Sequence, residues 1–388
     1  MNSEQSIELA SGLKISRVVT GLWQVADLER DGNRIDQEAA AQAMKKYFDA
    51  GLTTFDMADH YGSAEEIAGL FDLKYAKGKS QLLTKWVPAP GPVTKIQVRE
   101  AVHRALTRLQ TERINLMQFH AWNYADPSWL DCLFWLQELK SEGLIQCLGL
   151  TNFDTAHLRI ALHSGIEVVS NQVCYSLLDQ RASGAMTDLC MKYNVKLLAF
   201  GTVAGGFLTE RWLNKEEPAI DESLTWSQMK YKRYINTSGG WAVFQSLLET
   251  LHQVALKKNC TIATIASRYI LEQPAVGGVI IGARLGKSEH IQENVSLLSF
   301  SLDEETKNQI KEKLTQLSSI PGDCGDEYRK PPFLTASGDL SHHIKTMPVP
   351  YPAVKGYDGR IKALSGTVWE DLAGFSRAVK KGNRILVS

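Results

Sequence analysis

The sequence predicts an α/β protein folded as a (β/α)8 TIM barrel, with an N-terminal hairpin and a Pro/Gly-rich C-terminal extension. Eight apolar segments recur along the chain, and amphipathic segments of helical period lie between them. Most of the eight are continuously apolar, which is typical of parallel strands covered on both faces. A doubly wound sheet is the alternative, but no GxGxxG motif follows the first strand, where the chain has GLWQVAD. The pattern therefore favours a closed barrel.

The expected elements alternate in chain order. A hairpin over residues 7–16, with Ser11 and Gly12 at its turn, comes first. Barrel strands are expected at residues 17–23, 52–59, 80–87, 114–122, 145–152, 167–176, 195–202 and 275–283. Helices are expected over residues 36–50, 63–77, 94–109, 127–141, 154–164, 183–193, 241–259, 262–272 and 302–317. Thr94 and Asp126 are candidate N-caps, with Pro127 as a first helical residue.

The remaining parts of the chain are a long connection and a tail. Residues 203–240 are too long for an ordinary barrel connection, so we expect a lid at the carboxyl-terminal mouth. We expect the barrel to end near residue 325, because prolines and glycines then interrupt every period. The expected domains are therefore residues 1–325, a linker or extended wrap over 326–364, and a final segment over 365–388.

Composition excludes several classes of function. Of the 388 residues 44% are hydrophobic and 22% are charged, and the formal net charge is zero, so no broad basic surface for nucleic acid or anionic membrane is expected. Six scattered cysteines without a CxxC pair favour a reducing compartment and no structural zinc. The N-terminus lacks a secretory signal, and no apolar run reaches the length of a membrane span. We therefore expect a cytoplasmic protein that acts on a small molecule, with no metal, nucleic acid or membrane partner.

Four residues at the ends of expected strands have complementary chemistry: Asp56, Tyr61, Lys85 and His120. The carboxyl ends of barrel strands meet at one mouth, so we expect these side chains to converge. A phenol with an ordinary pKa of about 10 is a poor acid at neutral pH, and a neighbouring ammonium would lower that pKa. A carboxylate would hold the ammonium, and a histidine would donate to a carbonyl oxygen. Such a set suits proton transfer to a carbonyl that receives a hydride.

Taken singly, each of these residues has an ordinary structural explanation. Asp56 alone fits a buried cap or an ion-pair partner, and Tyr61, before Gly62, fits an aromatic residue packed on the rim. His120 alone fits a hydrogen-bonded core histidine. Lys85 is harder to explain in this way, because a lysine inside an apolar strand is unfavourable unless it is paired.

Several motifs in order along the chain resemble the aldo-keto reductase family. They are DMADHYGSAE, TKW, QFHAW, LGLTNF and NQVCYS, and their order and spacing match over most of the expected barrel. The resemblance implies that Tyr61 is the general acid, that Asp56 and Lys85 tune it, and that His120 orients the substrate carbonyl. A reaction between a nicotinamide cofactor and a carbonyl or alcohol is implied with it.

The same resemblance implies a set of cofactor-binding residues. Asn152 and Gln172 match positions that hold the nicotinamide carboxamide, and Thr151 stands where the family usually has serine. Phe200 falls where an aromatic ring stacks on the nicotinamide, and Gly201 and Thr202 follow it. Trp23 matches a residue near the cofactor and substrate pocket.

The segment IIGARLGKSEHIQEN resembles the family's site for the adenosine end of the cofactor. After Gly282, the cations Arg284 and Lys287 and an expected helix N-terminus at Ser288 favour an anion. A 2′-phosphate is the natural candidate, so NADP (NADPH) is expected rather than NAD. Two further residues of this segment, Glu293 and Asn294, match adenine contacts of the family. The plain structural alternative is a solvated basic turn.

Two alternatives stay open. A nucleotide-binding redox-sensing or regulatory protein of the same fold, with little turnover, would carry the same residues. The final segment, residues 365–388, resembles the opening of RidA-like (YjgF) domains, or else is an extended tail. A single strand of such a domain cannot form it alone, because its edges and apolar face lack partners.

Overall fold

The structure is a computed structural model that describes residues 5–29, 32–89, 91–122, 124, 126–221, 223–329, 353–356, 358–364, 370 and 376–387. The chain forms two compact units, residues 1–346 and residues 347–388, and each is described by itself. Among the described residues, no helix combines the length and apolar character that crossing a membrane requires.

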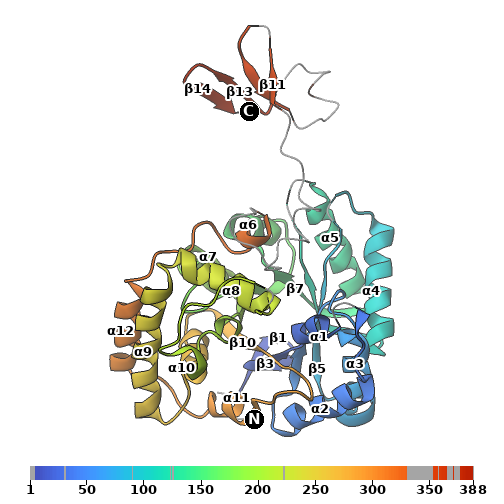
Figure 1. Ribbon diagram of the computed structural model, residues 1–388. Coiled ribbons are helices and arrows are strands. Elements are labelled where there is room, and N and C mark those ends of the chain that lie inside the picture. The colour runs from blue at the N-terminus through green and yellow to red at the C-terminus, as the bar shows by residue number, and fades with distance from the viewer. Residues whose placement is uncertain are drawn as a thin grey trace. The chain divides into compact units, whose positions relative to one another are not determined.

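The first unit is a closed barrel of eight parallel strands, as the sequence predicts (Figure 1). The strands are β3 (Val18–Gly21), β4 (Thr54–Asp56), β5 (Gln81–Trp86), β6 (Ile114–Phe119), β7 (Ile145–Thr151), β8 (Val168–Cys174), β9 (Lys196–Phe200) and β10 (Val276–Gly282). They pair in chain order, and β10 closes the barrel by pairing with both β9 and β3. Every strand falls within an expected segment.

Helices cover the outside of the barrel, with α2 to α5 (blue to cyan) on one side and α9 and α12 (yellow to orange) on another (Figure 1). The helices of this unit are α1 (Trp23–Leu28), α2 (Gln37–Asp49), α3 (Ala64–Phe71), α4 (Lys95–Leu109), α5 (Ser128–Ser141), α6 (Thr155–His163), α7 (Ala185–Tyr193), α8 (Trp226–Thr237), α9 (Trp241–Lys258), α10 (Ile262–Leu271), α11 (Ile291–Ser296), α12 (Glu304–Leu314) and α13 (Asp326–Arg329). Thr94 caps α4 through a capping box with Gln97, as expected. Helix α5 begins at Ser128, one residue later than expected. The Ser128 backbone N–H donates a hydrogen bond to the Asp126 side chain.

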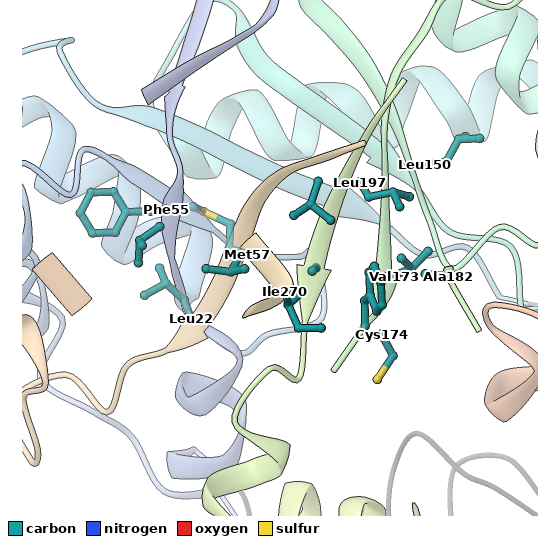
Figure 2. Packing of buried hydrophobic residues seen from close by; sticks show 14 of the residues in the cluster. Leu22, Phe55, Met57, Leu150, Val173, Cys174, Ala182, Leu197 and Ile270 are labelled. Carbon is teal, nitrogen blue, oxygen red and sulfur yellow. The ribbon is translucent and has the colours of Figure 1, made fainter. Parts of the chain in front are cut away.

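Each barrel strand turns alternate side chains toward the barrel interior and toward the helices. In β5, Leu83 belongs to a small interior cluster, whereas Leu82 and Trp86 belong to the larger cluster between barrel and helices. Figure 2 shows part of the larger cluster, with Leu22 and Phe55 among its side chains. In β5 the inward position in the body of the strand, Leu83, is therefore apolar, whereas the next inward position, Lys85, is polar and lies toward the carboxyl end, where the site lies.

The N-terminal hairpin closes the opposite end of the barrel. It pairs β1 (Ser6–Ala10) with β2 (Leu13–Ser16) in antiparallel fashion, as the sequence predicts. Leu9 and Leu13 join the interior cluster with Leu83. The hairpin thus covers the amino-terminal end of the barrel, opposite the carboxyl-terminal mouth that contains the site.

Three details differ from expectation. The connection 203–240 is not an irregular loop throughout, because it contains α8, which a capping box of Thr225 and Gln228 starts. Helix α11 begins at Ile291, not at Ser288, because Arg284 and Ser288 form an isolated bridge that closes a turn. A short helix that the sequence did not indicate, α13, follows residue 325.

The second unit contains an antiparallel sheet in the order β11-β12-β13-β14. Its strands are β11 (Ala353–Lys355), β12 (Ile361–Ala363), β13 (Ala378–Lys381) and β14 (Arg384–Val387). The last two fall within residues 365–388, and the expected linker over 326–364 lies largely outside the described residues.

Candidate active site

A buried ion pair between Asp56 and Lys85 lies inside the mouth of the barrel. Asp56 ends β4 and Lys85 lies in the neighbouring β5, both at inward parity. Lys85 Nζ is 2.7 Å from Asp56 Oδ2 and donates a second hydrogen bond to the Met57 carbonyl, also at 2.7 Å. Both side chains are less than 5% exposed. The ion pair with Asp56 compensates for the burial of the Lys85 ammonium inside an apolar strand.

Two glutamines complete the hydrogen bonds of Asp56. Its Oδ1 accepts from Gln172 Nε2 at 2.7 Å and from Gln118 Nε2 at 3.1 Å, and Gln172 Nε2 also donates to Gln118 Oε1. Gln172, expected to hold a carboxamide, therefore also holds the carboxylate. Gln118 is a site residue that no sequence motif indicated, although it precedes His120 by two residues and so shares its inward parity.

Tyr61 lies in the turn between β4 and α3, beside this ion pair. Lys85 Nζ is 5.0 Å from the centroid of the Tyr61 ring, and Trp23 of α1 meets the ring edge-on at 4.9 Å. Glu29 fixes the turn from the other side, because its carboxylate accepts from Ser63 N at 2.8 Å and Ser63 Oγ at 2.6 Å. Gly62 has a positive φ of 55°, and a Cβ there would meet Glu29 Oε2 at 2.1 Å, so both the backbone and this contact favour glycine in the turn.

The protonation of Tyr61 differs from the expectation. Burial, followed by the charge of Asp56, raises the pKa of Tyr61 well above its ordinary value. The expected lowering by Lys85 is wrong for this structure, because Lys85 donates hydrogen bonds to Asp56 and Met57 and faces the Tyr61 ring. Tyr61 is therefore a neutral phenol at neutral pH, and it holds its proton.

His120 follows β6 and is buried, 4% exposed, beside the same mouth. Its Nε2 has no hydrogen-bond partner among the described residues, although the atom is inaccessible to solvent. Burial, followed by the charge of Arg329, lowers the pKa of His120 well below its ordinary value. The imidazole is therefore neutral, with an unsatisfied nitrogen at the site.

The expected carboxamide-binding residues also carry unsatisfied atoms. Thr151 Oγ1 and Asn152 Oδ1 are buried and lack a partner within the described chain. Asn152 has a positive φ of 57°, a strained conformation for a residue other than glycine. Two orphaned oxygens of this kind suit an amide N–H₂ as donor, so these residues fit the carboxamide end of a nicotinamide.

The residues that end β9 are covered by α8. Lys230 Nζ lies 5.0 Å over the Phe200 ring. Gly201 has a positive φ of 79°, and a Cβ there would meet Tyr231 Oη at 2.1 Å, so this position favours glycine. Thr202 turns its hydroxyl to Ser267 at 2.9 Å. Phe200 keeps its place at the mouth, whereas the Thr202 side chain is buried away from it.

The loop after β10 is exposed and basic. Gly282, Arg284, Lys287 and Glu293 are exposed, and Asn294 of α11 is buried. Glu293 Oε2 contacts His290 Nδ1 at 3.1 Å. The helix N-terminus expected at Ser288 is wrong, so any anion here would rely on the two cations and the turn.

Helix α13 brings three adjacent residues into the mouth that no motif indicated. Glu327 is fully buried and pairs with Arg181 at 2.8 Å. The Tyr328 ring meets the His120 ring edge-on at 4.8 Å. Arg329 donates to the Asn152 carbonyl and, at 2.7 Å, to Tyr124 Oη. These contacts join positions far apart in the chain, so a local pattern could not have revealed them.

Comparison with known proteins identifies the class to which this fold and site belong. Residues 17–315 match the model of the aldo/keto reductase family, and the chain belongs to that family. Family membership supports oxidoreduction of carbonyl compounds as the general activity.

Three proteins similar to this chain match it over nearly their whole length. The NADH-specific methylglyoxal reductase of Escherichia coli (strain K12) is 24% identical over 77% of this chain and 95% of its own. The glycerol dehydrogenase of Gluconobacter oxydans has a similar fold, with a TM-score of 0.70 and 21% identity over 83% of this chain and 98% of its own. An aldo/keto reductase from Klebsiella pneumoniae, solved with NADP and acetate, gives a TM-score of 0.60 and 18% identity over 81% and 99%.

Proposed function

We propose that this protein is an NADP-dependent oxidoreductase that reduces an aldehyde or ketone, or oxidises the alcohol, with Tyr61 as general acid and base. The single observation that carries the proposal is the meeting of Tyr61, the Asp56–Lys85 pair and the unsatisfied His120 Nε2 at one mouth. The four residues come from the ends of three neighbouring strands, β4, β5 and β6, and together they have the chemistry that carbonyl reduction needs.

The nicotinamide, when bound, supplies or accepts the hydride. Thr151 and Asn152 would hold its carboxamide through their unsatisfied oxygens, and Phe200 would offer a ring face. Gln172 would contribute less freely, because its amide already donates to Asp56 and Gln118.

Tyr61 would hold the proton that a reduced carbonyl takes up. Its raised pKa keeps the phenol protonated before reaction, which is the state a proton donor requires. As the proton leaves, negative charge develops on the phenol oxygen, and the Lys85 ammonium beside the ring would stabilise that charge. Asp56 would keep the ammonium in place.

His120 would orient the carbonyl. A neutral imidazole with its proton on Nε2 can donate one hydrogen bond, and the lowered pKa of His120 keeps it neutral. Donation to the carbonyl oxygen would satisfy the buried Nε2 and polarise the carbon that receives the hydride.

The test is NADPH oxidation against a panel of aldehydes and ketones by wild type and Tyr61→Phe. We expect the variant to lose about 10²–10⁴ in kcat while it still binds NADPH, measured by fluorescence. Tyr75→Phe is the matched control, because its phenol contacts Glu38 on the outer surface. Nucleotide binding with negligible turnover in both wild type and Tyr61→Phe would instead support a regulatory protein.

A further inference from the structure

The segment that contains α13 is built to hold Arg329 at the mouth. Gly322 and Gly325 both have positive φ, of 90° and 81°. A Cβ at Gly325 would meet the Asn152 carbonyl oxygen at 2.1 Å and Arg329 Nη1 at 2.2 Å. The chain thus uses glycine where backbone and guanidinium approach most closely.

Neutral groups hold Arg329 in this position. Nη2 donates to Tyr124 Oη and to the Asn152 carbonyl, and Nη1 donates to the Cys324 carbonyl at 3.2 Å. The guanidinium also lies 4.3 Å from the centroid of the Tyr124 ring. Within the described ranges Arg329 contacts no carboxylate, and its buried Nε has no acceptor.

The nearby carboxylates have other partners. Asp154 accepts from the backbone and ring of His157, and Asp323 accepts from Thr155 N at 2.9 Å. Glu327 is engaged by Arg181 at 2.8 Å, and Lys230 lies 3.7 Å from it. Arg329 is therefore a partly buried cation whose Nε–H donates no hydrogen bond. Burying such a group is unfavourable unless an anion binds to it.

The position of Arg329 relates this cation to the carbonyl site. Its neighbour Tyr328 packs on His120, and Arg329 itself holds the backbone of Asn152. Its charge also contributes to the lowered pKa of His120. An anionic group bound at Arg329 would thus be part of the molecule whose carbonyl faces His120.

We propose that the substrate is a carbonyl compound that carries a carboxylate, and that Arg329 is the residue that selects it. One guanidinium with one free Nε–H matches a monoanion better than a phosphate ester, which carries nearly two charges at neutral pH. This inference rests on the proposed carbonyl reduction at Tyr61 and His120.

The kinetic test uses two aldehydes of nearly equal shape, 4-carboxybenzaldehyde and its neutral methyl ester, methyl 4-formylbenzoate. Wild type is expected to favour the acid in kcat/KM by about tenfold or more, and Arg329→Gln to remove that preference, because its kcat/KM for the acid falls about tenfold more than its kcat/KM for the ester. Arg329→Lys should keep part of the preference, because it retains the charge. Arg99→Gln is the control for net charge, since Arg99 pairs with Glu142 on the exposed surface.

A binding measurement separates this inference from the proposed function. Benzoate and benzamide are titrated calorimetrically into wild type and Arg329→Gln, which requires no turnover. Benzoate bound more tightly than benzamide by wild type only would support the carboxylate site even if no carbonyl is reduced. The inference would be overturned if wild type had equal kcat/KM for the acid and the ester and bound benzoate and benzamide equally. It would also be overturned if Arg329→Gln lowered kcat/KM for both aldehydes by the same factor, because Arg329 would then only anchor the segment that contains α13.

Discussion

The mouth of the barrel has two sides that are built in different ways. On the first side, Asp56, Tyr61, Lys85 and His120 come from consecutive βα units. Strand parity turns Asp56, Lys85 and His120 to one point, and the turn between β4 and α3 brings Tyr61 beside them. On the second side, α8 and α13 lie over the ends of β8 and β9, and buried ion pairs hold them there. The first side is thus part of the barrel, whereas the second is a cover assembled from distant segments.

This difference predicts where substitutions act. A change on the first side disturbs the barrel interior itself, so stability and chemistry should fall together. A change on the cover should weaken the closure of the site and leave the barrel folded. Two substitutions compare the two sides, and a double substitution outside both of them has the smallest expected effect.

The largest effect on stability is expected from Asp56→Asn. The substitution leaves the Lys85 ammonium, 3% exposed, without its carboxylate, and breaking a buried pair in this way costs about 3–5 kcal/mol. Urea unfolding should show that loss, and turnover should fall with it. Asp49→Asn is the matched control, since its pair with Lys45 is exposed and is worth less than about 1 kcal/mol. If both variants lost similar free energy of unfolding, the burial of the Asp56–Lys85 pair would not be the cause of the loss.

A smaller effect is expected from Glu327→Gln on the cover. The substitution removes the carboxylate that faces Lys230, whereas Arg181 still pairs with Asp179 at 2.6 Å. The free energy of unfolding should therefore fall by about 1–3 kcal/mol. Arg181 and Lys230 lower the pKa of Glu327 to about 2, well below about 4.3 in an unfolded chain. A depressed folded pKa means that this stabilisation is present above about pH 4.3 and is lost as the pH falls toward 2.

Unfolding at several pH values therefore checks the cover. The stability difference between wild type and Glu327→Gln should be full at pH 6 and should shrink between about pH 4 and pH 2. Glu142→Gln, which alters an exposed pair with Arg99, serves as control. A stability difference that stays constant down to pH 2 would show that the charge of Glu327 does not hold the cover.

Glu327→Gln is also expected to increase KM with little change in kcat, because the residues proposed to carry the chemistry lie on the other side of the mouth.

The two sides also explain how much the sequence could predict. The barrel, its hairpin and its strands follow from periodicity, which is local information. Lys85 could be singled out because lysine is rare inside an apolar strand, and Gln118 could have been found by the same parity. Glu327 and Arg329 could not, because their partners Arg181 and Asn152 lie more than a hundred residues away and no local pattern records such contacts. The direction of the Tyr61 pKa also depends on burial, which a spacing of residues does not express.

The smallest effect is expected at the loop after β10, outside both sides of the mouth. Arg284 and Lys287 are exposed, so each contact with a 2′-phosphate should be worth about 1 kcal/mol or less and should weaken with salt. Arg284→Ala with Lys287→Ala should raise the Kd for NADPH about tenfold at low salt and leave the Kd for NADH nearly unchanged. Lys257→Ala, on the exposed face of α9, controls for net charge. If NADPH and NADH weaken equally, or if wild type prefers NADH as its Escherichia coli relative is named for doing, these cations do not select a 2′-phosphate, and the proposed NADP preference is wrong while Tyr61 keeps its role.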